Sequence, residues 1–530
     1  MTSKVLTEKF KSQNALDFYN NLNVETYHVM ASCVTDISGD VVNSVAAKNE
    51  FLRRVIFGNS ITKDDARFLF RKISWVDGKI YTEYDDVVDL TNKDYYVTIL
   101  IGDIDEASYR VYKCINNNAG SASTVSPSTV SFGEMDDGYF GTSDGYIWKY
   151  MFDITPSEYT KYQTVSALPY RPLSSYNAND GIYNMKISES SDLALTLFSE
   201  HNLGACQILS TSQDADGNFA NRVQVINQLI NIKTEENAYV GMTLEVNGEL
   251  YDIIGSSKPS NLTGNILIIK TNEAPPIQKC FVKPKITITN SNNGGIKCQA
   301  SGILDEFGRL VRVHFNEHGS GYTYANAKLE LPRALSQFRD IVSLRPIVSP
   351  AGGHGADPVI ELKMSSIGIV TNIVADSNTN TPGTNTYTQV GLVKNASFTT
   401  DESTPLFFDN RNKLIVLGDV TNSIEPNKYI VQENDETVYG YIHEVNYDAD
   451  LNITDVWIVD YVGPAQTQLT SGIAQIKNAP NATDGISFEI NNIEQGGYVD
   501  KTGDLLHFVS FDPITRTTEN VEKIKFVFDF

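Results

Sequence analysis

The sequence predicts a mainly β protein of the α+β class, with several domains made of short antiparallel, sandwich-like β modules and a few helices near the N-terminus. Three observations lead to this prediction. At 530 residues the chain exceeds the roughly 250 to 300 residues at which one hydrophobic core stops growing. Short runs of alternating apolar and polar residues, rich in Val, Ile, Tyr and Thr, recur from residue 81 to the end. Helical spacing of apolar residues is concentrated in the first eighty residues.

Three helices are expected in that first part. Apolar residues recur at helical spacing between residues 10 and 22 and again between residues 52 and 56, which favours two short amphipathic helices. Thr62 and Asp65 have the spacing of a capping box, in which two side chains satisfy the free N–H groups of a helix start. Apolar residues then follow at i, i+3, i+4 and i+7, namely Ala66, Leu69, Phe70 and Ile73. We therefore predict a third helix after Thr62.

Strands are expected in the rest of the chain, separated by clusters of Asp, Asn, Ser and Gly. The predicted strands include 95–102, 109–115, 146–154, 264–270, 285–290, 309–315, 413–418, 429–434 and 455–462. Both faces of 109–115 carry large side chains, so this strand is expected to be covered on both sides. Asn247-Gly248 predicts a two-residue hairpin turn within 242–254. Residues 115–145 are polar and predict a long surface loop.

Two further patterns concern turns and the end of the chain. Gly319 and Gly321 are expected to adopt the positive φ angles of a tight turn, with Tyr322 packed over it. Alternation in the last strand places four apolar side chains on one face, and this face is expected to be buried. The four residues are Ile524, Phe526, Phe528 and Phe530.

The changes in pattern suggest four domains. Residues 1–175 are expected to form an N-terminal α+β core domain and residues 176–285 a β domain. Residues 286–375 are expected to form a β module with Gly-rich turns, which is a possible insertion. Residues 376–530 are expected to form a C-terminal β domain whose last strand returns to the core.

Charge and cysteine content restrict the partners. A formal net charge of -23 repels phosphate groups, so neither nucleic acid nor an anionic membrane is an expected partner. No stretch approaches the roughly 18 consecutive apolar residues of a membrane span, and no secretory signal is evident. Five scattered cysteines without metal-ligand spacing favour buried free thiols in a reducing compartment. They are Cys33, Cys114, Cys206, Cys280 and Cys298.

One motif resembles a metal site. His314, Glu317 and His318 match HxxEH, the inverted zinc-peptidase motif, which requires a helix to bring both imidazoles to one ion. The preceding residues alternate like a strand, on which positions i and i+4 lie about 13 Å apart. Two ligands so far apart cannot share one zinc ion. The metal interpretation is therefore disfavoured.

The remaining candidates also have simpler explanations. Asp214 to Asn218 begins like a calcium loop but lacks the glycine and the final bidentate carboxylate, which favours an acidic surface turn. His354, with Asp357 nearby, could act as a base, but no nucleophile is identifiable, so a packed histidine is favoured. Paired carboxylates at Asp64-Asp65, Asp85-Asp86 and Asp136-Asp137 neither locate nor exclude a glycosidase dyad. We predict no catalytic, cofactor-binding or metal-ligating residue and no enzymatic activity.

Several sequence blocks together resemble the baseplate wedge subunit of T-even-like contractile-tailed bacteriophages, the gene product eight family. The blocks are Lys9-Phe10 with 16–20, YRVYKC at 109–114, DGYIWKYMFDI at 144–154 and KIKFVFDF at 523–530. The segments 51–75 and GGHGADPVIEL at 352–362 also look like features of longer members. The resemblance is good over residues 1–170 and at the C-terminus, and faint in between. Much of 190–510 is expected to be inserted modules.

The resemblance implies a structural protein of the virion, assembled in the bacterial cytoplasm. It implies a homodimer within each wedge that contacts other wedge proteins, with no cofactor, no membrane insertion and no small-molecule substrate. The expected role is baseplate assembly, host attachment and contraction. One alternative is a receptor-binding or tail fibre protein of the same virion, suggested by the glycine turn at 319–321 and the Asn and Thr content. A second alternative is a tail-associated glycosidase or peptidase.

Overall fold

The structure of the chain is a computed structural model. It describes residues 7–33, 44–102, 108–131, 135, 137–173, 180–189, 198–290, 296–332, 334–335, 342–374, 385–399, 407–433, 435–462, 469, 471–478, 481–483, 485–499, 501–516 and 521–530. Within these residues the chain forms five antiparallel sheets and four short α-helices. The predicted mainly β fold is confirmed.

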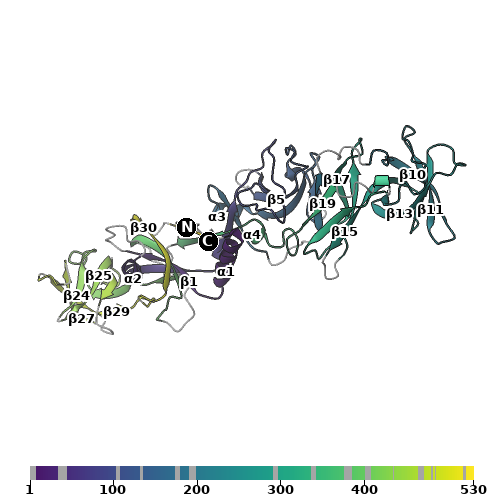
Figure 1. Cartoon of the computed structure of the whole chain (residues 1–530). Helices are drawn as coiled ribbons and strands as arrows, with labels where there is room; N and C mark the ends of the chain where they lie inside the picture. Colours follow the sequence, from purple (N-terminus) through teal and green to yellow (C-terminus); the bar gives the residue numbers. More distant parts are fainter. Residues whose placement is uncertain are drawn as a thin grey trace, which may run out of the picture. The chain divides into compact units, whose positions relative to one another are not determined.

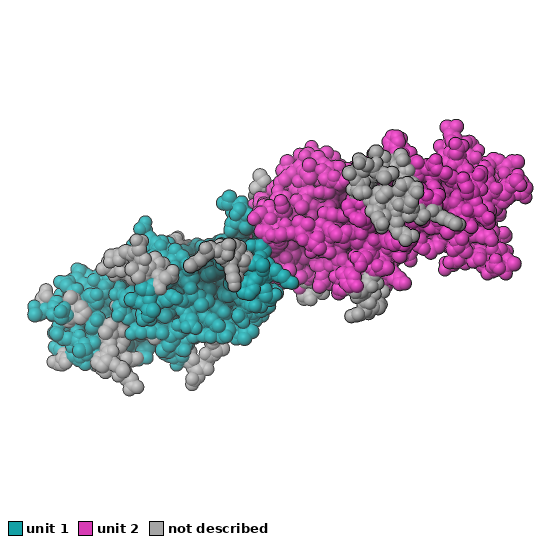
Figure 2. Space-filling model, viewed as in Figure 1, with its two compact units in different colours: residues 1–70, 160–171, 364–530 teal, residues 71–159, 172–363 magenta. Residues whose placement is uncertain are grey.

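The chain divides into two compact units (Figure 1, Figure 2). Unit 1 comprises residues 1–70, 160–171 and 364–530, and unit 2 comprises residues 71–159 and 172–363. The chain therefore passes between the units four times. The four domains expected from the sequence are continuous segments and do not map one to one onto these units, because each unit combines segments that are far apart in the chain.

Unit 1 contains three sheets. The first has the spatial order β22 (Phe407–Asp409), β2 (Val55–Ile61), β1 (Tyr27–Ser32), β21 (Asn385–Lys394) and β30 (Asp504–Arg516). The second has the order β31 (Val521–Asp529), β20 (Ser366–Val374), β3 (Ala66–Arg71) and β8 (Ala167–Tyr170). The third has the order β28 (Ile486–Ile490), β27 (Gly472–Lys477), β24 (Tyr429–Gln432), β25 (Asp435–Asp448), β26 (Ile453–Val462), β23 (Asn412–Leu417) and β29 (Asn492–Glu494).

Unit 2 contains two sheets. The smaller has the order β4 (Tyr96–Ile101), β5 (Ser108–Asn116), β7 (Ile147–Ile154) and β6 (Tyr139–Gly141). The larger begins with β10 (Ala205–Gln213), β11 (Phe219–Val225), β14 (Ile266–Thr271), β13 (Glu249–Ser257), β12 (Met242–Val246) and β15 (Lys279–Asn290). It continues through β18 (Ala325–Leu329), β19 (Val342–Val348) and β9 (Ile182–Glu189), while β16 (Gln299–Leu304) and β17 (Leu310–Glu317) branch from β15.

The first predicted helix is confirmed and the other two are corrected. Helix α1 (Glu8–Asn21) begins at the cap residue Thr7 and packs Tyr19 against Phe68, with ring centroids 4.9 Å apart. Helix α2 (Val45–Arg53) contains the first residue of the 52–56 pattern, but Val55 already starts β2. Two more helices, α3 (Pro156–Tyr162) and α4 (Pro358–Glu361), were not predicted.

The third predicted helix, after Thr62, is wrong. The capping box of Thr62 and Asp65 is present, but it caps a single 3-10 turn, and residues 66–71 form strand β3. β3 is hydrogen-bonded to β20 and β8, and five of its six residues are buried. A strand covered on both faces carries a continuous apolar run, which helical spacing also fits. The apolar pattern was therefore ambiguous.

The predicted strands are present, and the turns between them follow the expected chemistry. Asn247 and Gly248 have φ angles of 53° and 86° and join β12 to β13 as a two-residue hairpin. β5 is buried from Val111 to Ile115, so both of its faces are covered as predicted. The expected loop at 115–145 is irregular over most of its described length, but it also contains β6.

The apolar C-terminal strand is only partly buried. β31 pairs with β20 in the sheet that also contains β3, and Phe528 contacts Phe18 on α1, so the last strand packs with residues from the first part of the chain as expected. Phe526 is buried, whereas Ile524, Phe528 and Phe530 are of intermediate exposure. The ring of Phe18 on α1 covers Phe528 and Phe530, with centroids 5.9 and 5.4 Å away. The alternation correctly predicted the face but overestimated its burial.

The predicted glycine turn at 319–321 is confirmed. Gly319 and Gly321 have φ angles of 68° and 75°, and Tyr322 is buried with its hydroxyl accepting a hydrogen bond from the Cys298 N–H at 2.7 Å. A β-carbon on Gly319 would lie 2.7 Å from both the Cys298 nitrogen and the Ile296 carbonyl oxygen.

We expect Gly319→Ala to destabilise unit 2 by about 2 kcal/mol or more, because the substitution adds a backbone clash to the strain of a positive φ. Urea unfolding measures this loss. The matched control is Gly248→Ala, which also has a positive φ but meets nothing within 4 Å. Equal losses for both variants would show that the close approach at Gly319 has no energetic effect.

Among the described residues, no helix has both the length and the apolar character required to cross a bilayer.

Candidate functional site

Buried charged and polar side chains in unit 2 gather around the segment 81–91, which connects β3 to β4 along the chain. Its backbone is anchored to β5, since the Tyr84 N–H donates to the Cys114 carbonyl at 2.8 Å. The ring of Tyr84 contacts one cluster of charged residues, and the carboxylates of Glu83 and Asp85 contact another. We call the first cluster the buried triad and the second the acidic bridge.

The buried triad consists of Lys113 on β5, His354 in the glycine-rich turn 352–357, and Glu361 on α4. The Lys113 Nζ lies 2.6 Å from Glu361 Oε2 and 2.8 Å from His354 Nδ1. The side chains of these three residues are at most 3% exposed. A lysine withdrawn from water in this way requires a charged partner, which Glu361 provides.

Aromatic rings enclose the triad. The Lys113 Nζ lies 4.1 Å from the centroid of the Tyr84 ring, and that ring meets the His354 ring edge to face at 4.5 Å. The Tyr95 hydroxyl donates to the Glu361 carbonyl at 2.8 Å. A cation above an aromatic face is attracted by the ring quadrupole, and the attraction increases when water is excluded.

Burial and mutual charge determine the protonation states. Burial, followed by the Lys113 ammonium, lowers the pKa of His354 to about 4. Burial acts to raise the pKa of Glu361, but the Lys113 ammonium and the contact with His354 together outweigh it and lower that pKa to about 2. Burial lowers the pKa of Lys113, and the attraction of Glu361 opposes this effect. At neutral pH the triad is therefore an ammonium–carboxylate pair with a neutral imidazole that accepts from Lys113.

The turn 352–357 and α4 are shaped to hold the Glu361 carboxylate. Gly355 has a φ of 92°, and its N–H donates to Glu361 Oε1 at 2.6 Å. The Asp357 side chain caps α4 by accepting from the Ile360 N–H at 3.2 Å, and Pro358 follows at the first helical position. Asp357 is thus a cap and does not orient His354.

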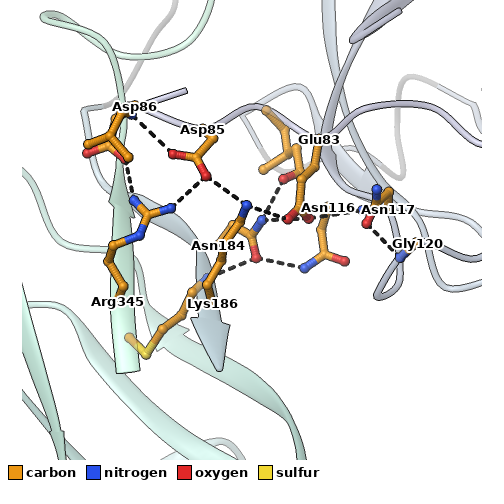
Figure 3. A network of polar contacts seen from close by, with 12 residues as sticks. Glu83, Asp85, Asp86, Asn116, Asn117, Gly120, Asn184, Lys186 and Arg345 are labelled. Atoms are coloured by element: carbon orange, nitrogen blue, oxygen red, sulfur yellow. Dashed lines mark hydrogen bonds and ion pairs between the residues drawn. The ribbon is translucent and has the colours of Figure 1, made fainter. Parts of the chain in front are cut away.

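The acidic bridge joins the segment 81–91 to strands β9 and β19 (Figure 3). Asp85 Oδ2 lies 2.6 Å from Arg345 on β19 and 2.7 Å from Lys186 on β9. Arg345 also contacts Asp86 at 2.8 Å, so its planar guanidinium spans two neighbouring carboxylates. The Asp85 side chain is 2% exposed. Its negative charge is therefore held by two cations.

Asn184 extends this network to β5. Its Nδ2 donates to the Ile115 carbonyl at 2.8 Å and to Glu83 Oε2 at 3.1 Å, and its Oδ1 accepts from Asn116 Nδ2 at 2.7 Å (Figure 3). The residue is 4% exposed. A buried amide whose donors and acceptor are satisfied fixes the relative position of the elements it contacts. The smaller sheet is therefore fastened to the β9 and β19 end of the larger sheet.

We expect Asp85→Ala to destabilise unit 2 by about 1 to 3 kcal/mol, because Arg345 and Lys186 lose a desolvated acceptor but keep access to water. Urea unfolding measures the loss. Asp86→Ala is the control, since Asp86 is more exposed and contacts Arg345 alone among these cations. The importance assigned to Asp85 would be refuted if the two variants were equally stable.

The residues of the HxxEH motif lie on a strand and directly after it, as the alternating pattern predicted. His314 is on β17, and His318 follows the strand. The His318 ring stacks on Tyr183 at 4.1 Å, and its Nδ1 lies 2.9 Å from the Ile182 carbonyl oxygen. Within the described part of the chain, no group of three or more His, Cys, Asp or Glu side chains is placed to hold a metal ion.

The other candidates from the sequence are also placed. Asp214 accepts from the N–H groups of Asp216 and Asn218 at 3.0 and 2.9 Å, as expected of a surface turn. Asp64 is exposed and Asp85 belongs to the acidic bridge, while Asp136 lies outside the described residues. His354 is packed in a turn as predicted. Sequence reasoning missed Lys113 and Glu361 as its partners.

The triad contains a base and a carboxylate, but its geometry is that of a closed network. Each charged group points at another, and the ring of Tyr84 covers the ammonium. The arrangement of the triad and the bridge suits the rigid fastening of two sheets.

A cleft of about 440 Å³ lies elsewhere in unit 2, between β12, β13, β15 and β16. Within it Asp252 is paired with Lys285 at 2.6 Å.

Neither a protein-family model nor a curated protein matches the sequence.

Proposed function

We propose that this chain is a structural subunit of a bacteriophage tail baseplate wedge, which acts through contacts with itself and with other wedge proteins. In this role the protein supplies rigid sheets and large contact surfaces. The proposal accounts for a fold in which buried charges connect elements of the chain to one another.

The observation that carries the proposal is that the sequence blocks resembling wedge subunits meet in space. The block 16–20 on α1 contacts the block 523–530 on β31 through Phe18 and Phe528, whose ring centroids are 5.9 Å apart. The block 109–114 on β5 pairs with the block 144–154 on β7. Blocks near the two ends of the sequence thus pack together, as parts of one framework would.

The segment 352–362 joins the same framework. It contributes His354 and Glu361 to the buried triad, and the block 109–114 contributes Lys113. A chance likeness between short blocks gives no reason for these residues to lie within hydrogen-bonding distance. The contact therefore supports a framework that includes β5, β7, the glycine-rich turn and α4.

The surface of unit 1 offers a place for assembly contacts. β30 is the last strand of the five-stranded sheet and, among the described residues, pairs on one side only, with β21. It exposes Leu506, Val509 and Ile514, which are 45%, 44% and 40% exposed. A long edge strand with apolar side chains invites pairing with another chain. We expect this edge to contribute to the self-association or to a contact with another wedge protein.

The test measures the mass of the purified protein in solution, alone and after mixing with the other tail proteins of its phage. We expect a dimer that enters a larger complex. The double variant Leu506→Lys, Val509→Lys should weaken one of these steps, because it places charge on the β30 edge. Leu417→Lys is the matched control, since Leu417 is 64% exposed on β23, which is paired on both sides.

Three outcomes would contradict the proposal. A trimer that ignores the tail proteins and binds host cells would identify a receptor-binding or fibre protein. Turnover of a cell-wall glycan or peptide would identify an enzyme. A monomer that joins no complex would exclude the wedge role.

A further inference from the structure

Six strands of the larger sheet in unit 2 form a closed ring. The order β10, β11, β14, β13, β12, β15 is completed by direct pairing of β10 with β15. This closing pair is the shortest in the ring, because it joins only three residue pairs. Each of the other five strand pairs joins four or more. We call the β10–β15 pair the seam.

Two cysteines occupy the middle of the seam. Cys206 on β10 lies directly opposite Cys280 on β15, between the pairs Ala205–Phe281 and Gln207–Lys279. Residues directly opposite in an antiparallel pair project to the same face of the sheet. Both side chains are 0% exposed and belong to the apolar core inside the ring. Both thiols are free.

The backbone geometry at the seam suits a bond between the two sulfur atoms. The Ile208 N–H donates to the Gln278 carbonyl at 3.0 Å, so the pair two residues earlier, Cys206–Cys280, is also of the hydrogen-bonded type. Such pairs have Cα atoms about 5.5 Å apart, within the range that disulfides span. The neighbouring Cys280 thiol, followed by burial, raises the pKa of the Cys206 thiol.

We propose that Cys206 and Cys280 are a redox modification site, at which a reversible cross-strand disulfide staples the seam of the ring. The reaction is thiol–disulfide exchange with a low-molecular-weight disulfide such as oxidised glutathione. One protein thiolate attacks a sulfur of glutathione disulfide and releases one glutathione thiolate. The second protein thiolate then displaces the other glutathione and forms the Cys206–Cys280 bond. Two protein thiols are oxidised, one disulfide is reduced, and two protons pass to the two glutathione products.

The position of the pair gives the bond a defined effect. Both thiols are buried, and the pKa of Cys206 is raised, so exchange requires the seam to open first. A seam held by few backbone pairs is the part of the ring where opening costs least. Once formed, the bond restrains that opening, because β10 and β15 can no longer separate. The proposal is independent of the wedge role.

The other two cysteines of unit 2 have different neighbours. Cys114 on β5 lies opposite Trp148, and Cys298 packs beside Tyr322. Cys33 belongs to unit 1. The bond is therefore expected at one site in the chain.

The test incubates the folded protein with glutathione redox mixtures, quenches it in acid, and alkylates free thiols in denaturant. Intact mass spectrometry of the wild type is expected to show three alkylated cysteines of the five and a loss of two hydrogen atoms. Peptide mapping should recover Cys206 joined to Cys280. Hydrogen exchange of β10 amides should become several-fold slower after oxidation, with little change in β5.

Variants separate this site from general thiol oxidation. Cys206→Ser and Cys280→Ser should each leave all four remaining cysteines open to alkylation. Cys298→Ser is the control, because it removes a buried thiol of the same unit and should leave the bond intact. Alkylation of all five wild-type cysteines at every redox ratio would overturn the proposal. Glutathione attached to single cysteines without a cross-link would also overturn the proposal. Both of these outcomes are measured on the wild-type protein alone.

Discussion

Glu361→Gln is expected to destabilise unit 2 by about 3 to 5 kcal/mol, because it leaves the Lys113 ammonium buried without a counter-charge. The glutamine keeps the size of the side chain and an oxygen for the Gly355 N–H, so the lost charge is the main change. Urea unfolding followed by tryptophan fluorescence measures the effect. A Trp457→Phe background restricts the signal to Trp75 and Trp148, which both lie in unit 2.

Two further variants test whether charge is the cause. Asp89→Asn removes the partner of Lys363 at the same segment, but the Asp89 side chain is 79% exposed, so we expect a far smaller loss than in Glu361→Gln. Lys113→Met combined with Glu361→Gln removes both charges and should be more stable than Glu361→Gln alone. If the double variant were less stable than the single variant, the penalty would not come from an unpaired ammonium.

Unit 2 is expected to lose stability as the pH falls from about 6.5 to about 4, because of His354. The folded state lowers the pKa of His354 from 6.5 to about 4. Between these two pH values the unfolded chain binds a proton at His354 that the folded chain does not bind. Uptake of that proton favours unfolding, and the lost stability amounts to about 3 kcal/mol. Below this window Glu361 acts in the same direction, since its folded pKa of about 2 lies under the ordinary value of 4.5.

Urea unfolding between pH 4 and pH 7 in the same tryptophan background measures this dependence. His354→Gln should flatten the curve, because the glutamine does not titrate. The control is His443→Gln: burial, followed by Arg411, also lowers the pKa of His443 to about 4, but this residue lies in unit 1. An unchanged slope in His354→Gln would mean that other groups govern the acid sensitivity of unit 2.

The strands were predictable because local residue patterns determine them. Alternation and turn residues located β12, β13 and the Asn247-Gly248 hairpin between them, since a two-residue turn fixes the register of its flanking strands. β3 was mistaken for a helix because its burial comes from β20, which lies about three hundred residues further along the chain. No local pattern reveals such a partner.

The candidate site shows the same limit. In the sequence His354 was considered as a base that Asp357 could orient, although a packed histidine was favoured. The actual partners are Lys113, which is 241 residues away, and Glu361. One signal was available, since a lysine in the middle of a strand covered on both faces must be buried and must therefore have a counter-charge. The identity of that counter-charge required the tertiary fold.

The interleaved composition of the two units has a consequence for synthesis on the ribosome. Unit 2 ends at residue 363, so all of its strands have been made while unit 1 still lacks β20, β21, β30 and β31. The early strands β1 and β2 pair with each other, but their outer neighbours β21 and β22 are translated much later, as is β20, the neighbour of β3. The apolar edges of those early strands are exposed to wrong pairing throughout this interval. Nascent chains should therefore depend on chaperones for unit 1 far more than for unit 2.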